Sequence, residues 1–202
     1  MIPPKEKNLF KLSQQISDMP ALEVGAVGYS PKFLTKMSLP CSDPKTNEYR
    51  RVDGNKQLII LSPSDVGIPY GGSARIILIW MVTQLKIRKT RSVELGRSQN
   101  EFVRQLAKRS SGGRTGSLNG LRKQSQRILS STFLVVDEGD SHWNLDGIRV
   151  SKKVRMLWTP KAKNNWNANI DIDDHFYQEA VTSAIPVDLR VISAFSHFPL
   201  AM

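Results

Sequence analysis

The order of apolar and polar positions along the chain predicts short strands that flank one long buried helix. Two runs, Glu48 to Val52 and Lys56 to Leu61, lie on either side of Asp53-Gly54, a dipeptide that favours a tight hairpin turn. The mixed apolar run from Lys32 to Leu39 favours another strand. From Ser73 to Lys89 the apolar run is too long for an ordinary strand and continues into helix formers, so we expect a largely buried helix there.

The next part of the chain predicts a strand and two further helices. Arg91 to Leu95 reads as a short strand, and Ser98-Gln99-Asn100-Glu101 has the form of a capping box that opens a helix, with Phe102 and Leu106 facing its core. After the break at Ser110-Ser111-Gly112-Gly113, a third helix is expected from about Thr115 to Ser131. Its apolar stripe comprises Leu118, Leu121, Ile128 and Leu129.

A two-stranded hairpin is expected to follow this third helix. Phe133 to Asp137 reads as its first strand, and the alternating apolar positions from Ile148 to Trp158 read as its second strand, with a loop from Glu138 to Gly147. Helix, strand, helix, turn, helix and hairpin is the element order of a winged helix-turn-helix domain. The hairpin would form the wing.

These elements give an α+β protein with three parts. Residues 1–28 are expected to form an N-terminal arm with at most one short helix, and residues 29–160 the winged-helix domain. Residues 161–202 are expected to begin a second small α+β domain, for which a winged helix is one alternative. In that last part we expect a strand from Trp166 to Ile172, a helix capped by Asp173 or Asp174, and a helix opened by Pro186-Val187-Asp188.

The excess of basic residues indicates which class of partner the protein binds. The chain has 29 Lys and Arg against 18 Asp and Glu, a net charge of +11. Twelve basic and only two acidic residues lie between Lys86 and Arg127. A single basic helix face is usually just solvated, but so much charge in one segment favours a polyanion-binding surface.

The remaining composition points to a folded protein of the cytoplasm. Cys41 is the only cysteine, which excludes an internal disulfide and any site built from several cysteines. The N-terminus lacks the apolar stretch of a signal peptide, and the longest strongly apolar run, Ile76 to Val82, is too short to cross a bilayer. We therefore expect a bacterial cytoplasmic protein without a membrane partner.

No motif of catalysis is present. Nicking initiators need two histidines separated by one residue, and His142, His175 and His197 are each isolated. Gly112-Gly113-Arg114-Thr115-Gly116 lacks the lysine of a phosphate-binding loop. Three aspartates near residue 172 could be imagined as a magnesium site, but a strand face and a helix cap explain them better. We expect no enzymatic activity, no cofactor and no metal.

A series of motifs resembles the RepA-type plasmid replication initiators. The motifs are Gly67-Ile68-Pro69-Tyr70-Gly71, Ile79-Trp80, Glu94-Leu95-Gly96-Arg97-Ser98, Gly112 to Ser117, Leu121-Arg122 and Pro186-Val187-Asp188-Leu189-Arg190. The resemblance implies binding to double-stranded DNA repeats at a plasmid origin, recruitment of host replication proteins and control of copy number. The family pattern continues past Phe198-Pro199-Leu200 into a further helix, so we expect residues 161–202 to be an incomplete second domain.

The third helix is the expected DNA reader, because its outer face lies opposite the apolar stripe. Base-edge candidates are Arg114, Asn119, Arg122, Lys123 and Gln126, and Arg127 lies on the same outer side. Lys108, Arg109 and Ser117 are better placed for phosphates, and Arg149, Lys152 and Lys153 form a second basic cluster on the hairpin. Arg122 could instead pair with Glu101.

Two other functions remain open at this point. A transcriptional regulator that binds a single operator could use the same fold, and an interaction scaffold could present the basic face to an acidic protein. The sequence leaves the oligomeric state open, with a homodimer among the alternatives.

Overall fold

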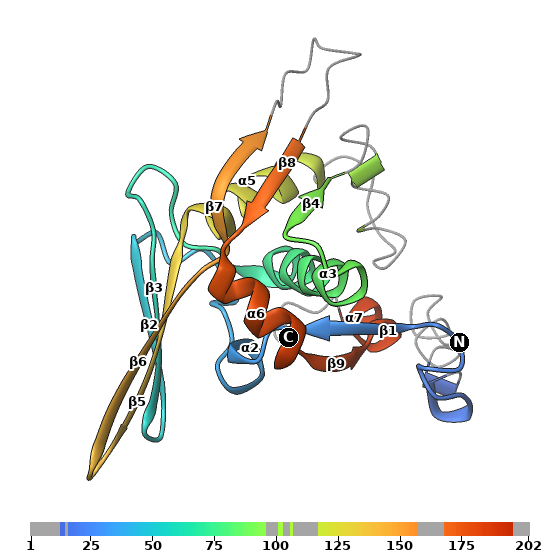
Figure 1. Cartoon of the computed structure of the whole chain (residues 1–202), viewed down its shortest axis with the longest axis horizontal. Helices are drawn as coiled ribbons and strands as arrows, with labels where there is room; N and C mark the ends of the chain where they lie inside the picture. Colours follow the sequence, from blue (N-terminus) through green and yellow to red (C-terminus); the bar gives the residue numbers. More distant parts are fainter. Residues whose placement is uncertain are drawn as a thin grey trace, which may run out of the picture.

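The computed structural model describes residues 13–14, 16–95, 101–102, 106, 117–156 and 168–195. It shows the expected α+β class: three antiparallel sheets surround one long central helix, α3, which spans Gly71–Arg88 (Figure 1). Helix α3 is buried on nearly every side, as its apolar run predicts. It ends at Lys89, whose φ of 51° is left-handed and stops the helix. Within the described residues, no helix is long and apolar enough to cross a membrane.

The largest sheet has four strands in the order β2-β3-β5-β6. They are β2 (Glu48–Asp53), β3 (Lys56–Leu61), β5 (Thr132–Gly139) and β6 (His142–Arg149). The β2-β3 hairpin around Gly54, whose φ is 56°, confirms the turn predicted from Asp53-Gly54. The inner face of the sheet contributes Leu58, Ile60, Phe133 and Ile148 to the core.

The expected wing hairpin is wrong in two respects. Residues 138–147 were expected to form a loop, but β5 and β6 pair without interruption from Thr132↔Arg149 to Gly139↔His142. The strand after Ile148 does not stay with β5: the chain continues into β7 (Ser151–Met156), which pairs with a different strand. The pattern misled because β6 is exposed almost to its end, and its apolar residues Trp143 and Leu145 lie on the opposite face from Ile148, so no single apolar stripe runs along the strand.

A second sheet has the order β4-β8-β7, where β4 spans Ser92–Glu94 and β8 spans Ala168–Ile172. Helix α6 (Asp174–Thr182) follows β8 and is capped by Asp173, whose side chain accepts from the backbone N–H of His175. These elements confirm the predicted strands and the predicted cap. Ile170 and Phe176 lie in the same buried cluster as α3, so the described part of residues 161–202 shares its core with the elements before it. The division into domains at residue 160 stays a prediction.

The two ends of the described chain meet in a two-stranded sheet beside α3. Strand β1 (Val27–Ser30) pairs antiparallel with β9 (Ile185–Asp188), and α7 (Leu189–Phe195) follows directly (Figure 1). The helix expected to open at Pro186 therefore begins only at Leu189. Residues Ile185–Asp188 form a strand instead, and Pro186 is tolerated because β9 is an edge strand.

The strand expected from Lys32 to Leu39 is also wrong, because one helical turn, α2 (Phe33–Lys36), lies there. Phe33 and Met37 are four residues apart, and both are buried. The helical turn directs Thr35 away from this pair, and Thr35 is exposed, whereas a strand would place all three side chains on one face. Phe33 packs against Phe133 of the sheet, with ring centroids 5.2 Å apart.

Candidate nucleic-acid interface

The interface is built on helix α5, which spans Ser117–Ser130. Four residues on one side are buried: Gln124, Ser125, Ile128 and Leu129. Lys123 and Gln126 are exposed on the other side, and Arg122 is half-buried. This pattern follows the helical period and confirms the predicted amphipathic helix with its polar outer face.

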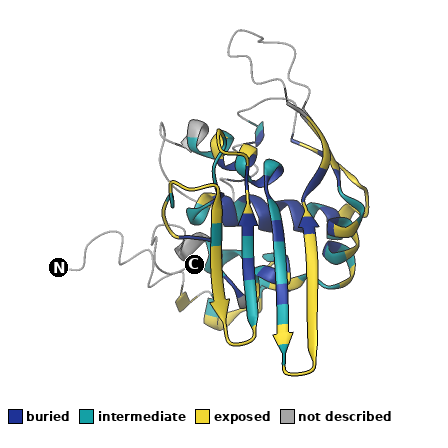
Figure 2. Cartoon of the chain, turned by 90° about the vertical axis from the view of Figure 1, so that its left-hand side faces the viewer, coloured by how far each residue is buried: buried dark blue, intermediate teal, exposed yellow. Residues whose placement is uncertain are grey.

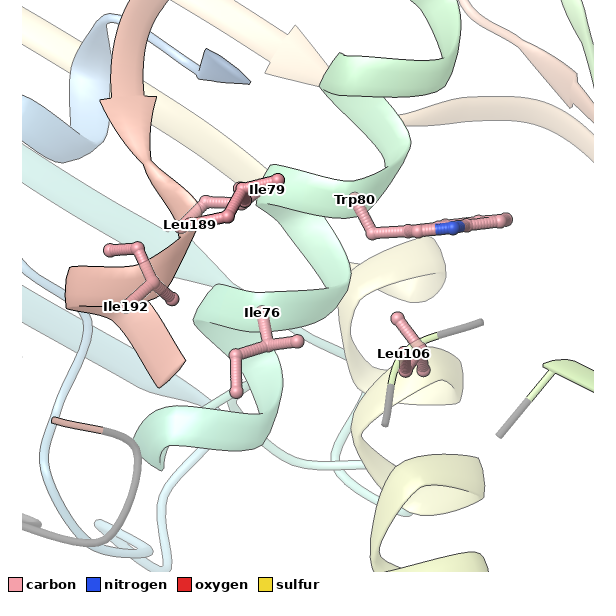
Figure 3. A pocket seen from close by; sticks show the side chains of 6 residues that line it. All are labelled: Ile76, Ile79, Trp80, Leu106, Leu189 and Ile192. Atoms are coloured by element: carbon pink, nitrogen blue, oxygen red, sulfur yellow. The ribbon is translucent and has the colours of Figure 1, made fainter. Parts of the chain in front are cut away.

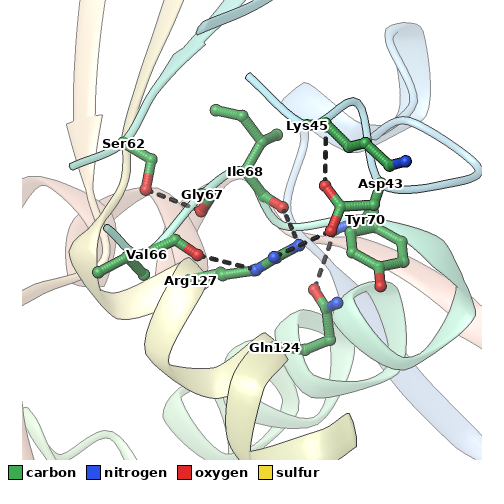
Figure 4. A network of polar contacts seen from close by, with 9 residues as sticks. All are labelled: Asp43, Lys45, Ser62, Val66, Gly67, Ile68, Tyr70, Gln124 and Arg127. Carbon is green, nitrogen blue, oxygen red and sulfur yellow. Dashed lines mark hydrogen bonds and ion pairs between the residues drawn. The ribbon is translucent and has the colours of Figure 1, made fainter. Parts of the chain in front are cut away.

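Arg127 fixes α5 to the loop between β3 and α3 (Figure 4). Its Nε donates to the carbonyl oxygen of Val66 and its Nη1 donates to that of Ile68, each at 3.0 Å. Its Nη2 donates to Oδ2 of Asp43 at 3.0 Å, and the guanidinium carbon lies 5.0 Å from the centroid of the Tyr70 ring. With the side chain only 16% exposed, these contacts use the guanidinium inside the protein.

Helix α5 contacts the loop between β3 and α3 at a second point, through Gln124. Oε1 of the buried Gln124 accepts from the backbone N–H of Tyr70 at 3.0 Å. Gly67 has a φ of 82°, a conformation that favours glycine, and Ser62 Oγ donates to its carbonyl oxygen at 2.8 Å. A Cβ at Gly67 would also lie 3.2 Å from Nη2 of Arg127. We call these contacts of Arg127 and Gln124 with Asp43 and the loop 62–70 the α5 anchor.

Asp43 completes the α5 anchor as a carboxylate. The backbone N–H of Lys45, which donates to its Oδ1 at 3.0 Å, and the hydrogen bond from Arg127 hold the pKa of Asp43 below its usual value. Asp43 is therefore ionised at neutral pH, and its charge balances the guanidinium.

The anchor changes the place of Arg127 among the predicted DNA contacts. The helical pattern placed Arg127 on the outer face, but its guanidinium turns into the protein. Gly67-Ile68-Pro69-Tyr70-Gly71 was part of the family resemblance, yet nothing in the sequence linked this motif to an arginine some 60 residues later. The pairing with Asp43 was not visible either.

The second basic cluster lies on β7, which is in contact with α5: Ser151 Oγ donates to the carbonyl oxygen of Leu129 at 3.1 Å. Lys152 and Lys153 are both exposed. Lys152 forms an ion pair with Asp174, and its hydrogen bond is the main cause that lowers the pKa of that carboxyl. Of the two lysines, Lys152 is neutralised by a carboxylate. The described contacts show no carboxylate next to Lys153.

The remaining candidates are spread over other parts of the chain. Arg149 is exposed at the end of β6, in the four-stranded sheet rather than in the sheet of β7. Ser117 and Asn119 belong to α5, but their side chains are not described. Three further candidates lie wholly outside the described residues, namely Lys108, Arg109 and Arg114. Apart from Arg149, the candidates that the structure shows exposed are Lys123 and Gln126 on α5 and Lys152 and Lys153 on β7, two elements that are in contact.

The described residues contain no group of three His, Cys, Asp or Glu side chains that could hold a metal ion. A hollow between α3 and α7 is lined by apolar side chains, namely Ile76, Ile79, Trp80, Leu106, Leu189 and Ile192 (Figure 3). Such a lining lacks the convergent polar groups of a catalytic pocket.

Comparison with known proteins gives one family and two distant structures. Two crystal structures of RctB domains 2 and 3, one a selenomethionine derivative, match with a TM-score of 0.49 and 10% identity. The matches cover 75% and 76% of this chain but 59% and 60% of the RctB chains, so the chain spans about three fifths of their length. No curated protein sequence matches. The family described as plasmid-encoded RepA protein, RepA_C, matches residues 68–202, which is two thirds of the chain, and the chain belongs to this family.

Proposed function

We propose that this protein initiates plasmid replication by binding repeated sequences in double-stranded DNA at the plasmid origin. The observation that carries the proposal is that the two sides of α5 differ. One side is bound to the protein by the α5 anchor, and Lys123 and Gln126 are exposed on the other side. A rigidly held helix with polar outer positions is the element that reads a major groove. Membership of the RepA family and the basic segment before α5 support the same assignment.

The residues differ in what they can do on DNA. Gln126 can donate to and accept from an adenine edge, and Lys123 can donate to guanine. Lys152 and Lys153 on β7 are suited to phosphates, which position the protein without reading sequence. Asn119 and Ser117 on α5, together with Arg122, Lys108, Arg109 and Arg114, remain proposed contacts. Arg127 is left out because its donors are used within the α5 anchor.

The first test separates reading from positioning. We expect Gln126→Ala to weaken binding to an origin-repeat duplex by about 5- to 100-fold and to leave binding to a scrambled duplex nearly unchanged, since a lost base contact costs about 1–3 kcal/mol. Lys153→Ala should weaken both duplexes alike and lower the slope of log affinity against log salt by about 1. Fluorescence anisotropy at several salt concentrations measures both effects.

The matched control is Arg51→Ala, which also removes one exposed cation but lies on β2 in the four-stranded sheet. It should change neither affinity beyond twofold. Equal losses on both duplexes for Gln126→Ala would show that α5 is not the reader.

A second experiment separates an initiator from a transcriptional regulator of a single operator. A plasmid that carries the origin repeats as its sole origin is maintained with the intact chain, and we expect Gln126→Ala to reduce its copy number in proportion to the loss of specific binding. Maintenance of that plasmid in cells that lack the protein would overturn the initiator assignment. The regulator would then be the better reading.

A further inference from the structure

The outer face of the four-stranded sheet carries several exposed apolar side chains, and no described element covers it. Figure 2 looks straight onto this face, with α3 behind the strands. Cross-strand pairing places Val52, Gln57, Val136 and Leu145 in one row across the sheet. Val52 is 59% exposed, Leu145 is 49% exposed, and Trp143 in the next row is 61% exposed. Large apolar side chains gathered on one open face mark an interaction surface.

This patch is separate from the main core. Side chains alternate along β5, so Phe133 faces the core and Val136 faces outward. Val136 is only 6% exposed, yet it is not part of the core cluster, so its neighbours on the outer face cover it. Ile59 and Leu134, half-buried in the adjacent row, extend the same apolar surface.

The charge of this sheet does not suit nucleic acid. The charged side chains in the rows of the outer face are Glu48, Arg50, Glu138 and Arg149, a net charge of zero in a chain of +11. A polyanion would find no net attraction on this face, whereas the rest of the protein attracts it. The partner of this face is therefore a protein surface.

We propose that the partner is a second copy of this chain, which stacks its own outer face on the first. A twofold axis that runs parallel to the strands, between β3 and β5, would place β2 of each copy over β6 of the other, and β3 over β5. The register then sets Val52 opposite Leu145 and Ile59 opposite Leu134 of the second copy. In these two rows every apolar side chain meets an apolar side chain or the half-buried Gln57 of the other copy, whereas Leu61 in the end row meets Thr132.

The charges at one end of the sheet fit the same arrangement. Glu48, Leu61, Thr132 and Arg149 form the row at that end. The twofold axis brings Glu48 of each copy over Arg149 of the other. Two ion pairs form in this way, each between a carboxylate and a guanidinium. Packed sheets cross at about 30°, and the long side chains of Glu and Arg tolerate this offset. The alternative axis, perpendicular to the strands, would place Glu48 opposite its own β2 strand and leave Arg149 without this partner.

The size of the face sets the expected strength. Four strands at about 4.8 Å spacing and six to eight residues at about 3.4 Å each give a face of roughly 19 by 20–27 Å. A pair of such faces lies at the low end of specific interfaces, so we expect a reversible dimer with a dissociation constant in the micromolar range. The inference is independent of the proposed function.

Sedimentation velocity on the full chain, without DNA and from 1 to several hundred micromolar, tests the proposal. We expect the weight-average mass to rise from monomer to dimer. Leu145→Lys should keep the chain monomeric over this range, because it places a charge in the stacked apolar row. Ile87→Lys, on the exposed end of α3 where the parent side chain is 63% exposed, is the matched control and should dimerise like the parent. Circular dichroism establishes that each variant is folded.

Charge reversal tests the orientation of the two copies. Glu48→Arg alone and Arg149→Glu alone each put like charges together in both pairs, one on either side of the twofold axis, so each should weaken the dimer at least fivefold. An equimolar mixture of the two variants restores both pairs and should form a heterodimer. A parent chain that stays monomeric at the highest concentration overturns the proposal. A parent dimer that neither Leu145→Lys nor the charge reversals affect would place the interface elsewhere and overturn it equally.

Discussion

At the scale of single residues, the most informative contact is the one between Arg127 and its partners. A guanidinium presents several donors in a fixed plane, and Arg127 uses three of them for Val66, Ile68 and Asp43. The outward position of Arg127 on the helical wheel was predictable, but its inward turn was not. Helical periodicity gives the direction of Cβ, whereas a long side chain follows the acceptors that the tertiary fold supplies.

Replacing Arg127 should destabilise the protein rather than only weaken DNA binding. We expect Arg127→Ala to lower the free energy of unfolding by about 2–4 kcal/mol, because two carbonyl oxygens and a carboxylate lose a charged donor. Arg127→Lys should recover little of this, since an ammonium cannot reach three acceptors in one plane. Urea unfolding measures both. Wild-type stability in Arg127→Ala would show that the anchor is dispensable.

The α5 anchor should also depend on pH in the acid range. The folded state lowers the pKa of Asp43, so the stabilisation is fully present above the unfolded value near 3.8 and is lost as pH falls through the folded value. Asp43→Asn should therefore be less stable than the parent at neutral pH. The difference should shrink below about pH 4. Urea midpoints for both proteins from pH 7 to pH 3 test this, and a difference that grew on acidification would contradict the assignment.

At the scale of elements, the helices α3, α5 and α6 and the first hairpin were predictable, whereas the strands β6 and β9 and the helical turn α2 were not. The runs that became α3 and α5 carry strong periodic signals, and Asp53-Gly54 specifies a turn by local chemistry. The apolar residues Trp143 and Leu145 of β6 lie on the opposite face from Ile148, and β9 is an edge strand that contains Pro186, so neither strand shows a continuous apolar stripe. Strand β6 pairs with β5, and β9 pairs with β1. These pairings depend on the tertiary fold, so a short stretch of sequence does not predict them.

The junction of β1 with α3 and α7 allows no extra side chain at Gly28. A Cβ there would overlap the Leu189 side chain and lie 3.3 Å from Thr83 Oγ1, which accepts from the neighbouring Tyr29 N–H. We expect Gly28→Val to lower the free energy of unfolding by about 1–3 kcal/mol through overpacking. Ala26→Val, two residues earlier, is the control and should change stability by less than half as much. Thermal unfolding by calorimetry distinguishes them.

At the scale of the whole molecule, segments that are distant in sequence share one core. Strand β3 lies between β2 and β5, α6 packs near α3, and β1 pairs with β9. The family match begins at residue 68, inside the loop that holds Arg127, so its boundary does not coincide with a boundary of the fold.

A fragment of residues 68–202 should therefore fail to fold cooperatively. It lacks β2 and β3, which leaves one edge of β5 open, and it lacks both Asp43 and Val66 from the α5 anchor. We expect no sigmoidal urea transition for this fragment, measured by tryptophan fluorescence alongside the full chain. A sharp transition with a midpoint close to that of the full chain would show that the fragment is a self-sufficient domain.

The α5 anchor has a consequence for how such a protein can change over evolution. The side chains that fasten α5 occupy different positions from those exposed on it: Gln124 and Arg127 meet the loop, and Lys123 and Gln126 face outward. Under the proposed function, mutations at the outward positions alter which origin is recognised without a cost in folding. Related plasmids could thus diverge in origin sequence, and so become compatible within one cell, while the fastened positions stay under constraint.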